Sequence, residues 1–193
     1  MSEPTTVLTD YALAAVSAFL GCRLIPYSRF WSLAFVALAL GALLGGTWHG
    51  FRQSDLLWKA TTLSVGVASF GMVAGSADGV TAGKLRGGLI TFAGVKLIGY
   101  AAWMLYHDDF IWVVADTASA LLIVAMLHAW RFSGWILSGV AVSVLAGLAQ
   151  ASGFALHERF NHNDLYQVLQ IGAMFLFYRG VRTYATDGRR PST

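Results

Sequence analysis

Seven long apolar segments dominate the sequence and restrict what it can fold into. They cover about residues 8–25, 31–50, 56–75, 87–106, 110–130, 133–156 and 162–181. A helix of about 20 apolar residues crosses the hydrocarbon core of a bilayer. The segments are too long for membrane strands and lack alternation with a period of two. The sequence therefore predicts an all-α integral membrane protein, a bundle of seven transmembrane helices.

Composition and spacing support a single membrane domain. The chain has 193 residues, of which 56% are hydrophobic and 12% charged, whereas soluble domains carry about 25% charged residues. The one cysteine, Cys22, excludes a disulfide within the chain and a cysteine-based metal site. Connections between segments are short, and the longest is the Gly-rich stretch 75–86. We expect one domain over residues 1–181 and a short basic cytoplasmic tail over 182–193, held at anionic headgroups.

The positions of the charges predict the orientation in the membrane. If the N-terminus is outside, nine basic residues fall at inner ends and loops: Arg23, Arg29, Lys84, Arg86, Arg131, Arg179, Arg182, Arg189 and Arg190. Only Arg52, Lys59 and Arg159 fall at outer ends. The positive-inside rule then predicts an outside N-terminus and a cytoplasmic C-terminus. The first segment has no basic residue before it, unlike a secretory signal, so we expect it to be retained.

Aromatic and small residues fit the same arrangement. All seven tryptophans lie near segment ends, where we expect them at the headgroup level: Trp31, Trp130 and Trp135 inside, and Trp48, Trp58, Trp103 and Trp112 outside. In the second segment, Gly41–Gly45 and Gly46–Gly50 have the small-xxx-small spacing that favours close helix packing.

A polar cluster is predicted at the outer face. Four of the five histidines fall there (His49, His107, His157 and His162), and only His128 is at the inner face. In the last segment, His162, Tyr166 and Gln170 recur every four residues, with Asn163 and Gln167 alongside. This stripe faces the bundle interior or a water-filled cavity, because lipid cannot satisfy such groups. It is either an interhelical hydrogen-bond network or the wall of a pocket.

Two ionisable residues lie deeper in the membrane. Counted along a helix, Lys96 is roughly 15 Å and Asp116 roughly 10 Å below the outer end. Their helices are neighbours in sequence, so we expect an ion pair that offsets the cost of burying either charge. Alternatively, Asp116 points into the outer pocket as a metal ligand or proton carrier.

The positions of the histidines resemble those of a known superfamily. The chain resembles the superfamily of the alkaline ceramidases and progestin/adiponectin-type receptors in three features: seven spans with an outside N-terminus, His49 at the end of the second span, and a histidine that opens the last. The phrase "NHNDLYQVLQ" in the last span is also similar to one in uncharacterised bacterial seven-helix membrane proteins. The resemblance implies zinc bound by His49 and His162 and hydrolysis of lipid amides. Where the superfamily has a serine in the second span and a second histidine in the last, this chain has Gly45 and Tyr166.

Three functions follow from these features. The first is a zinc-dependent lipid amide hydrolase, with His49, His162 and His157 as metal ligands and Asp116 and Asp164 in catalytic roles. The second is a non-enzymatic protein that binds a lipid or small ligand, or whose site has degenerated. The third is a proton-coupled transporter that uses the Lys96–Asp116 pair and the polar stripe. The pocket or network residues are Tyr166, Gln167, Gln170, Asn163 and Lys96.

Partners and location follow from the same composition. We expect membrane lipids as partners, a lipid as substrate, and no nucleic acid, because no basic stripe or phosphate-binding loop is present. Compactness and the resemblance favour a bacterial inner membrane. The sequence leaves the ligand and the oligomeric state open.

Overall fold

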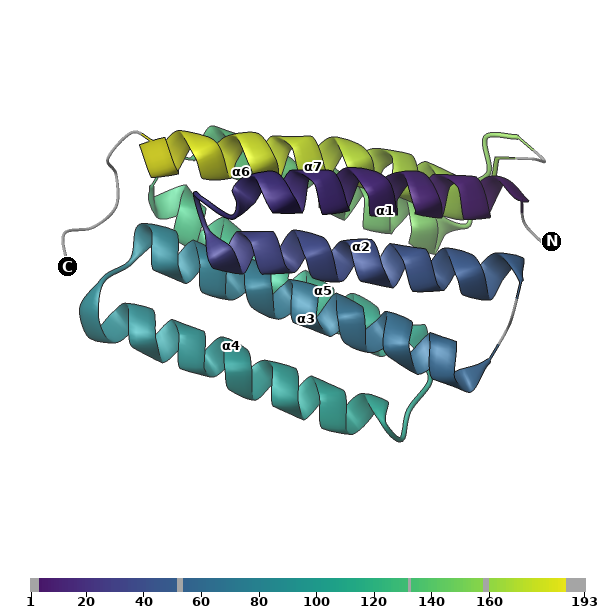
Figure 1. Ribbon diagram of the computed structural model, residues 1–193, viewed down its shortest axis with the longest axis horizontal. Helices are drawn as coiled ribbons and strands as arrows, with labels where there is room; N and C mark the ends of the chain where they lie inside the picture. The colour runs from purple at the N-terminus through teal and green to yellow at the C-terminus, as the bar shows by residue number, and fades with distance from the viewer. Residues whose placement is uncertain (1–3, 52–53, 132, 158–159, 187–193) are drawn as a thin grey trace.

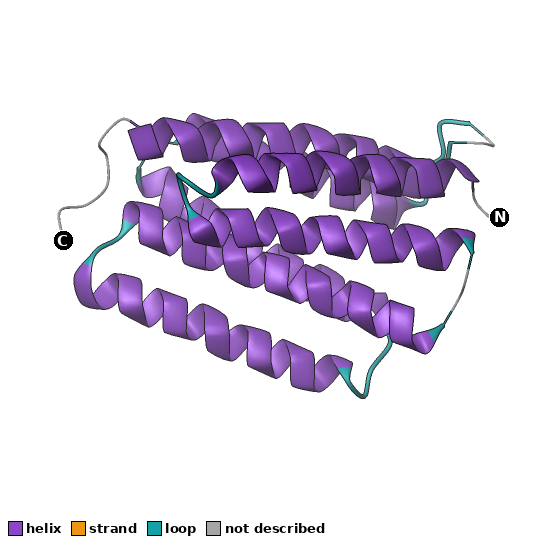
Figure 2. Cartoon of the chain, in the orientation of Figure 1, coloured by secondary structure: helices purple, strands orange, loops and turns teal. Residues whose placement is uncertain are grey.

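Seven antiparallel helices form the part of the chain that the computed structural model describes, which is residues 4–51, 54–131, 133–157 and 160–186. Figures 1 and 2 show an elongated up-and-down bundle. The helices are α1 (Pro4–Leu24), α2 (Arg29–Gly50), α3 (Asp55–Val80), α4 (Gly83–Met104), α5 (Phe110–Trp130), α6 (Gly134–Ser152) and α7 (His162–Thr186).

Six of these helices, α1 to α6, are long and apolar enough to cross a membrane. α7 has 25 residues but is not among them. Its polar opening, His162 to Gln170, and the charged Arg179 and Arg182 near its other end lower its hydropathy. The predicted all-α bundle is thus confirmed, with six segments of membrane-spanning character. The orientation of the bundle stays a prediction.

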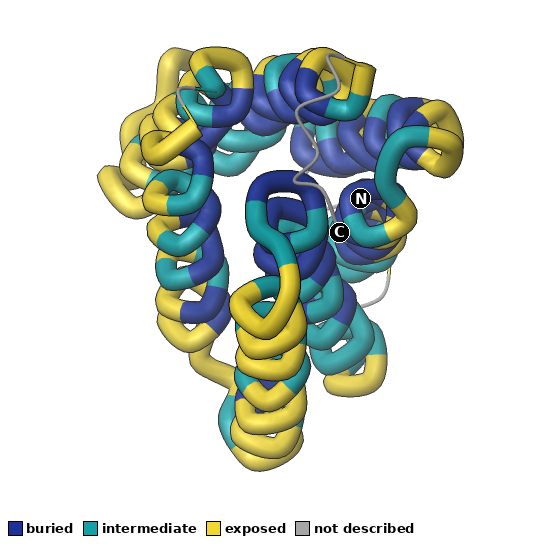
Figure 3. The backbone as a smooth tube through the Cα atoms, turned by 90° about the vertical axis from the view of Figure 1, so that its left-hand side faces the viewer, coloured by how far each residue is buried: buried dark blue, intermediate teal, exposed yellow. Residues whose placement is uncertain are grey.

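Helix packing produces a ring with one helix outside it. The principal contacts link α1 to α2, α2 to α3, α3 to α5, α5 to α6, α6 to α7 and α7 back to α1. α4 packs chiefly on α3, outside this ring. In the end-on view of Figure 3, buried residues face the interior and exposed residues face outward. Because α4 is held mainly by α3, its side towards α5 is left partly uncovered.

The centre of the ring is aromatic. The Trp31 side chain is fully buried and packs against Phe177, with ring centroids 5.4 Å apart, and against Phe35 at 6.5 Å. Trp31 is near the helix end as predicted, but its ring packs inside the bundle and not on the bundle surface. Its position one turn into α2 places it opposite small residues of α3, where a large ring fits.

Glycines mark the closest helix contacts. A Cβ at Gly46 would lie 2.9 Å from Asp10, and one at Gly50 would lie 2.5 Å from Val7, so α1 and α2 meet along this pair. Gly41 faces Val65 and Ser64 of α3 at 3.4 and 3.6 Å. The close packing predicted from the small-xxx-small spacing is confirmed.

The predicted loop over residues 75–86 is wrong, because most of it is helical. α3 continues to Val80 and α4 begins at Gly83. The small residues in this stretch serve packing: a Cβ at Gly75 would lie 2.5 Å from Trp31, and one at Gly79 would lie 2.6 Å from Tyr184. Glycine is thus needed here because the helices pack closely. The sequence alone does not distinguish a glycine at a close helix contact from a glycine in a turn.

Two other predicted boundaries differ at the chain's later elements. α6 ends at Ser152, with Gly153 in the left-handed conformation (φ 67°) that closes a helix. α7 continues through Thr186, so residues 182–186 of the predicted tail are helical. Residues 187–193 of that tail lie outside the described residues.

Candidate functional site

A lateral groove runs between α4 and α5, which both pack on α3. Its volume is about 450 Å³. Four residues of each helix line it, at spacings of three and four that put them on one helical face: Lys96, Gly99, Tyr100 and Trp103 of α4, and Trp112, Ala115, Asp116 and Ser119 of α5. Gly99 and Ala115 contribute almost no side chain, so the groove is open at mid-length.

The floor of the groove is the ion pair predicted from the sequence. Lys96 Nζ lies 2.5 Å from Asp116 Oδ1 and also donates to the Asp116 carbonyl oxygen at 3.0 Å. The Lys96 side chain is 17% exposed and the Asp116 side chain 6%. Ser119 Oγ donates to the same Asp116 carbonyl at 2.7 Å. The pair therefore bridges two helices that otherwise make little contact.

Neither member of the pair has all its hydrogen-bonding capacity filled by described residues. An ammonium group has three N–H donors, and Lys96 directs two of its contacts to Asp116. Asp116 Oδ2 is buried without a hydrogen-bond partner in the described part of the chain. In a low-dielectric setting such unfilled capacity is costly. An added polar group at the groove would lower that cost.

Aromatic rings close the groove at the end where α4 turns into α5. Trp103 and Trp112 meet edge to face, with centroids 5.1 Å apart. The His107 ring stacks on Trp103 at 3.9 Å, and its Nδ1 is 2.9 Å from the Trp103 carbonyl oxygen. Both tryptophans are partly exposed, at 45% and 39%. Amphipathic rings of this kind prefer the headgroup level of a membrane, so we expect this end of the groove near the interface.

Contacts with α3 fix the frame of the groove. Tyr100 donates its hydroxyl to the Thr62 carbonyl oxygen at 3.0 Å. Lys59 donates to the carbonyl oxygen of Met104 at 2.6 Å and pairs with Asp108 at 2.6 Å. A cation that bonds the last carbonyls of a helix stabilises its C-terminus. Lys59 thus fixes the end of α4, a role that its place in the sequence did not reveal.

The polar stripe of α7 is engaged elsewhere, in an interhelical network with α1 and α6. Gln167 donates through its side-chain amide to Asp10 Oδ1 of α1. Asn163 Oδ1 accepts from Gln150 of α6 at 3.4 Å. Gln170 is buried and Tyr166 is half-buried on the same helix. Of the two roles predicted for the stripe, these contacts are those of an interhelical network.

Asp164 caps α7. Its Oδ2 accepts from the Asn161 backbone N–H at 2.8 Å, and Asn161 Oδ1 accepts from the backbone N–H groups of Asn163 and Asp164. This reciprocal arrangement is a capping box. Thr9 of α1 also donates to Asp164 Oδ1 at 3.2 Å. The carboxylate is thus used by the helix terminus, apart from the groove that contains Asp116.

The three histidines predicted as metal ligands lie at the same end of the bundle. His49 is half-buried in the last turn of α2, and its ring centroid is 5.1 Å from that of Trp48. His157 is exposed, and its backbone pairs with Phe160. His162 begins α7. Within the described ranges, no three His, Cys, Asp or Glu side chains are grouped closely enough to hold a metal ion. Zinc therefore stays a prediction, and no reaction step is derived through it.

Asp10 is the polar residue that the sequence reasoning missed as a site. Its side chain is buried, and the residue is 3% exposed, six residues into α1. Besides accepting from Gln167, it lies next to Gly46. An acid inside an apolar segment was a usable signal, but the position near the N-terminus made Asp10 look like an ordinary outer-face charge.

The helices and their composition define the class of protein, a polytopic α-helical membrane protein. The chain belongs to the family described as "Family of unknown function (DUF6962)", whose model matches residues 5–186. That match covers all seven helices almost completely. No curated protein and no solved structure matches the chain.

Proposed function

We propose that this protein binds a membrane lipid in the α4–α5 groove and has no catalytic role there. This is the second of the three functions predicted from the sequence, and the proposal assigns it to the residues of this groove. The observation that carries it is the Lys96–Asp116 pair, which forms the floor of a groove open to the side of the bundle. The hydrolase and the transporter stay predictions.

Depth in the membrane supports a lipid as the ligand. Lys96 is eight residues from the end of α4 and Asp116 is six residues from the start of α5. At 1.5 Å per residue, the pair is about 9–12 Å below the outer helix ends. The groove therefore joins the interfacial tryptophans to a charged pair inside the apolar zone, a span that an amphiphile can occupy along its length.

The lining specifies the chemistry of that amphiphile. The remaining Lys96 donor calls for an acceptor, such as a carbonyl or hydroxyl oxygen of the lipid. Phe92, one turn from Lys96 on the same face of α4, is exposed and offers apolar surface to a hydrocarbon chain. Trp103 and Trp112 would then contact the headgroup region.

The proposal is tested by filling the groove. Ala115→Phe places a large ring in the open middle of the groove. Ala118→Phe is the matched control, since Ala118 is also an exposed alanine of α5 but does not line the groove. Lipid that remains after detergent purification is counted by native mass spectrometry. We expect wild type and Ala118→Phe to retain a lipid that Ala115→Phe loses.

The outcomes separate a specific site from a general lipid coat. Equal retention by all three proteins would refute binding in the groove. A second variant, Lys96→Met/Asp116→Leu, removes the polar floor while keeping the side-chain volume similar. We expect it to bind lipid more weakly than wild type, and unchanged retention would refute the role given to the ion pair.

A further inference from the structure

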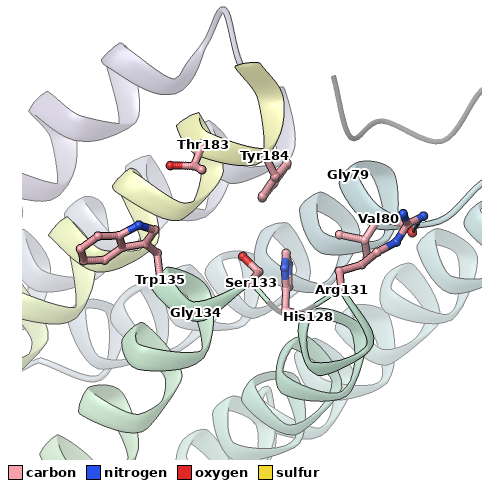
Figure 4. Close-up of a pocket in the computed structure, with 9 residues that line it drawn as sticks. All are labelled: Gly79, Val80, His128, Arg131, Ser133, Gly134, Trp135, Thr183 and Tyr184. Atoms are coloured by element: carbon pink, nitrogen blue, oxygen red, sulfur yellow. Dashed lines mark hydrogen bonds between the residues drawn. The ribbon is translucent and has the colours of Figure 1, made fainter. Parts of the chain in front are cut away.

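A second cavity lies at the opposite end of the bundle, where the C-terminal part of α7 approaches α3, α5 and α6. Its volume is about 130 Å³. Figure 4 shows its lining residues: Gly79, Val80, His128, Arg131, Ser133, Gly134, Trp135, Thr183 and Tyr184. A single buried water needs only about 10–15 Å³ by a comparable measure. The cavity is thus large enough for a small polyatomic group.

His128 is the most unusual residue in this cavity. It is fully buried, and neither ring nitrogen has a hydrogen-bond partner among the described residues. In Figure 4 its ring stands beside Ser133 and below Tyr184, and the centroids of the His128 and Tyr184 rings are 5.6 Å apart. Buried polar groups in proteins are nearly always paired. Two unpaired ring nitrogens on the wall of a cavity therefore point to a ligand.

The N-terminus of α6 opens onto the same cavity. Ser133 is its N-cap residue, but the Ser133 side chain makes no capping hydrogen bond. Gly134 and Trp135, the first two residues of this 19-residue helix, also line the cavity. Free N–H groups and the positive end of the helix dipole favour an anion at such a position.

Positive charge gathers around the cavity. Arg131 lines it, and its Nη2 donates to the Val80 carbonyl oxygen at 3.0 Å, which leaves the rest of the guanidinium fork without a partner among the described residues. Figure 4 places this guanidinium beside Val80, at the rim. Arg179 lies over the Trp135 ring at 4.1 Å. The nearby acid, Asp78, is 3.8 Å from Arg86 and is thus compensated.

We infer that this cavity is a binding site for a phosphate group, held by the His128 ring, the N-terminus of α6 and the Arg131 guanidinium. A phosphate oxygen accepts from the N–H of one His128 ring nitrogen, the one that faces the cavity. The remaining phosphate oxygens accept from the α6 backbone and the Ser133 hydroxyl. The phosphate belongs either to a free phosphate compound or to the headgroup of an anionic lipid, which have this chemistry in common.

Binding is measured on the full-length, delipidated protein in a neutral detergent. One arm uses radiolabelled inorganic phosphate, and the other uses native mass spectrometry with dioctanoyl phosphatidic acid and phosphatidylcholine. Arg131→Gln and Ser133→Ala test the site on residues that are not buried, and His128→Gln tests the ring. Arg23→Gln is the control, because Arg23 is at the same end of the bundle but does not line the cavity.

We expect one or both phosphate probes to bind wild type and Arg23→Gln, and to bind Arg131→Gln about tenfold or more weakly, as for the loss of a charge-assisted hydrogen bond. Binding of inorganic phosphate identifies a free compound as a ligand. Binding of phosphatidic acid alone identifies the headgroup. Binding by neither probe, or equal binding to Arg131→Gln and Arg23→Gln, overturns the inference. Ala115→Phe, which fills the distant groove, is expected to leave this binding unchanged.

Discussion

Removing one charge from the Lys96–Asp116 pair should destabilise the protein more than removing both. Lys96→Met leaves the Asp116 carboxylate, 6% exposed, without its cation 2.5 Å away. Breaking a buried pair in this way typically costs about 3–5 kcal/mol. Asp116→Leu should cost less, because the long Lys96 side chain can extend along the groove towards the interface. Replacing both residues, as Lys96→Met/Asp116→Leu, should cost less than about 1.5 kcal/mol.

The assay is reversible unfolding in mixed micelles, followed by tryptophan fluorescence, for wild type, both single variants and the double variant. The four free energies of unfolding form a double-mutant cycle that isolates the coupling between the two side chains. We expect a coupling of about 2 kcal/mol or more, which is at the high end for interactions within membranes. Additive losses, with the double variant as unstable as the sum of the singles, would refute the reasoning that the pair bridges α4 and α5.

Three further predictions concern packing, capping and orientation. Gly71→Ala should destabilise the protein by about 1–3 kcal/mol in the same unfolding assay, because the added Cβ would meet the Ala34 backbone at 2.7 Å. Gly87→Ala, on the open face of α4, should be neutral or stabilise the protein by up to about 1 kcal/mol. Equal effects of the two changes would contradict the ring arrangement. Asp164→Ala should lower the free energy of unfolding by about 1–2 kcal/mol, because it removes the hydrogen bond that caps α7. Asp109→Ala should lower it by less than about 0.5 kcal/mol, because the Asp109 side chain makes no capping bond. Similar losses would show that the capping box contributes nothing. In a Cys22→Ser background, single cysteines introduced at the α5–α6 turn should react with an impermeant reagent only from the cytoplasmic side. Reaction from outside would reverse the predicted orientation.

The sequence was informative wherever physical constraints act along one helix. Apolar segments of membrane length predicted the helices, and the deep placement of Lys96 and Asp116 predicted their pairing, because an isolated charge at that depth is too costly. The spacing Gly46–Gly50 predicted a close approach of two helices. Each of these signals depends only on residue type and separation within one or two neighbouring segments.

Features that depend on which helices contact one another could not be predicted from the sequence. Nothing in the order of segments indicates that α4 lies outside a ring of six, and this position is what leaves the groove open. Trp31 was expected at the interface because it starts a helix, yet the glycines of α3 make room for it in the core. Asp10 and Asp164 look alike in sequence as acids near helix ends, but only Asp164 is a cap, and Asp10 accepts from Gln167 instead.

The most direct test of lipid binding is photocrosslinking in membranes with a phospholipid that carries a diazirine on its acyl chain, followed by mapping of the labelled peptides. We predict labelling concentrated on the α4 and α5 segments around Gly99 and Ala115, strongly reduced in Ala115→Phe and retained in Ala118→Phe. Labelling spread evenly over all the outward-facing helices, and unchanged by Ala115→Phe, would contradict a lipid site between α4 and α5.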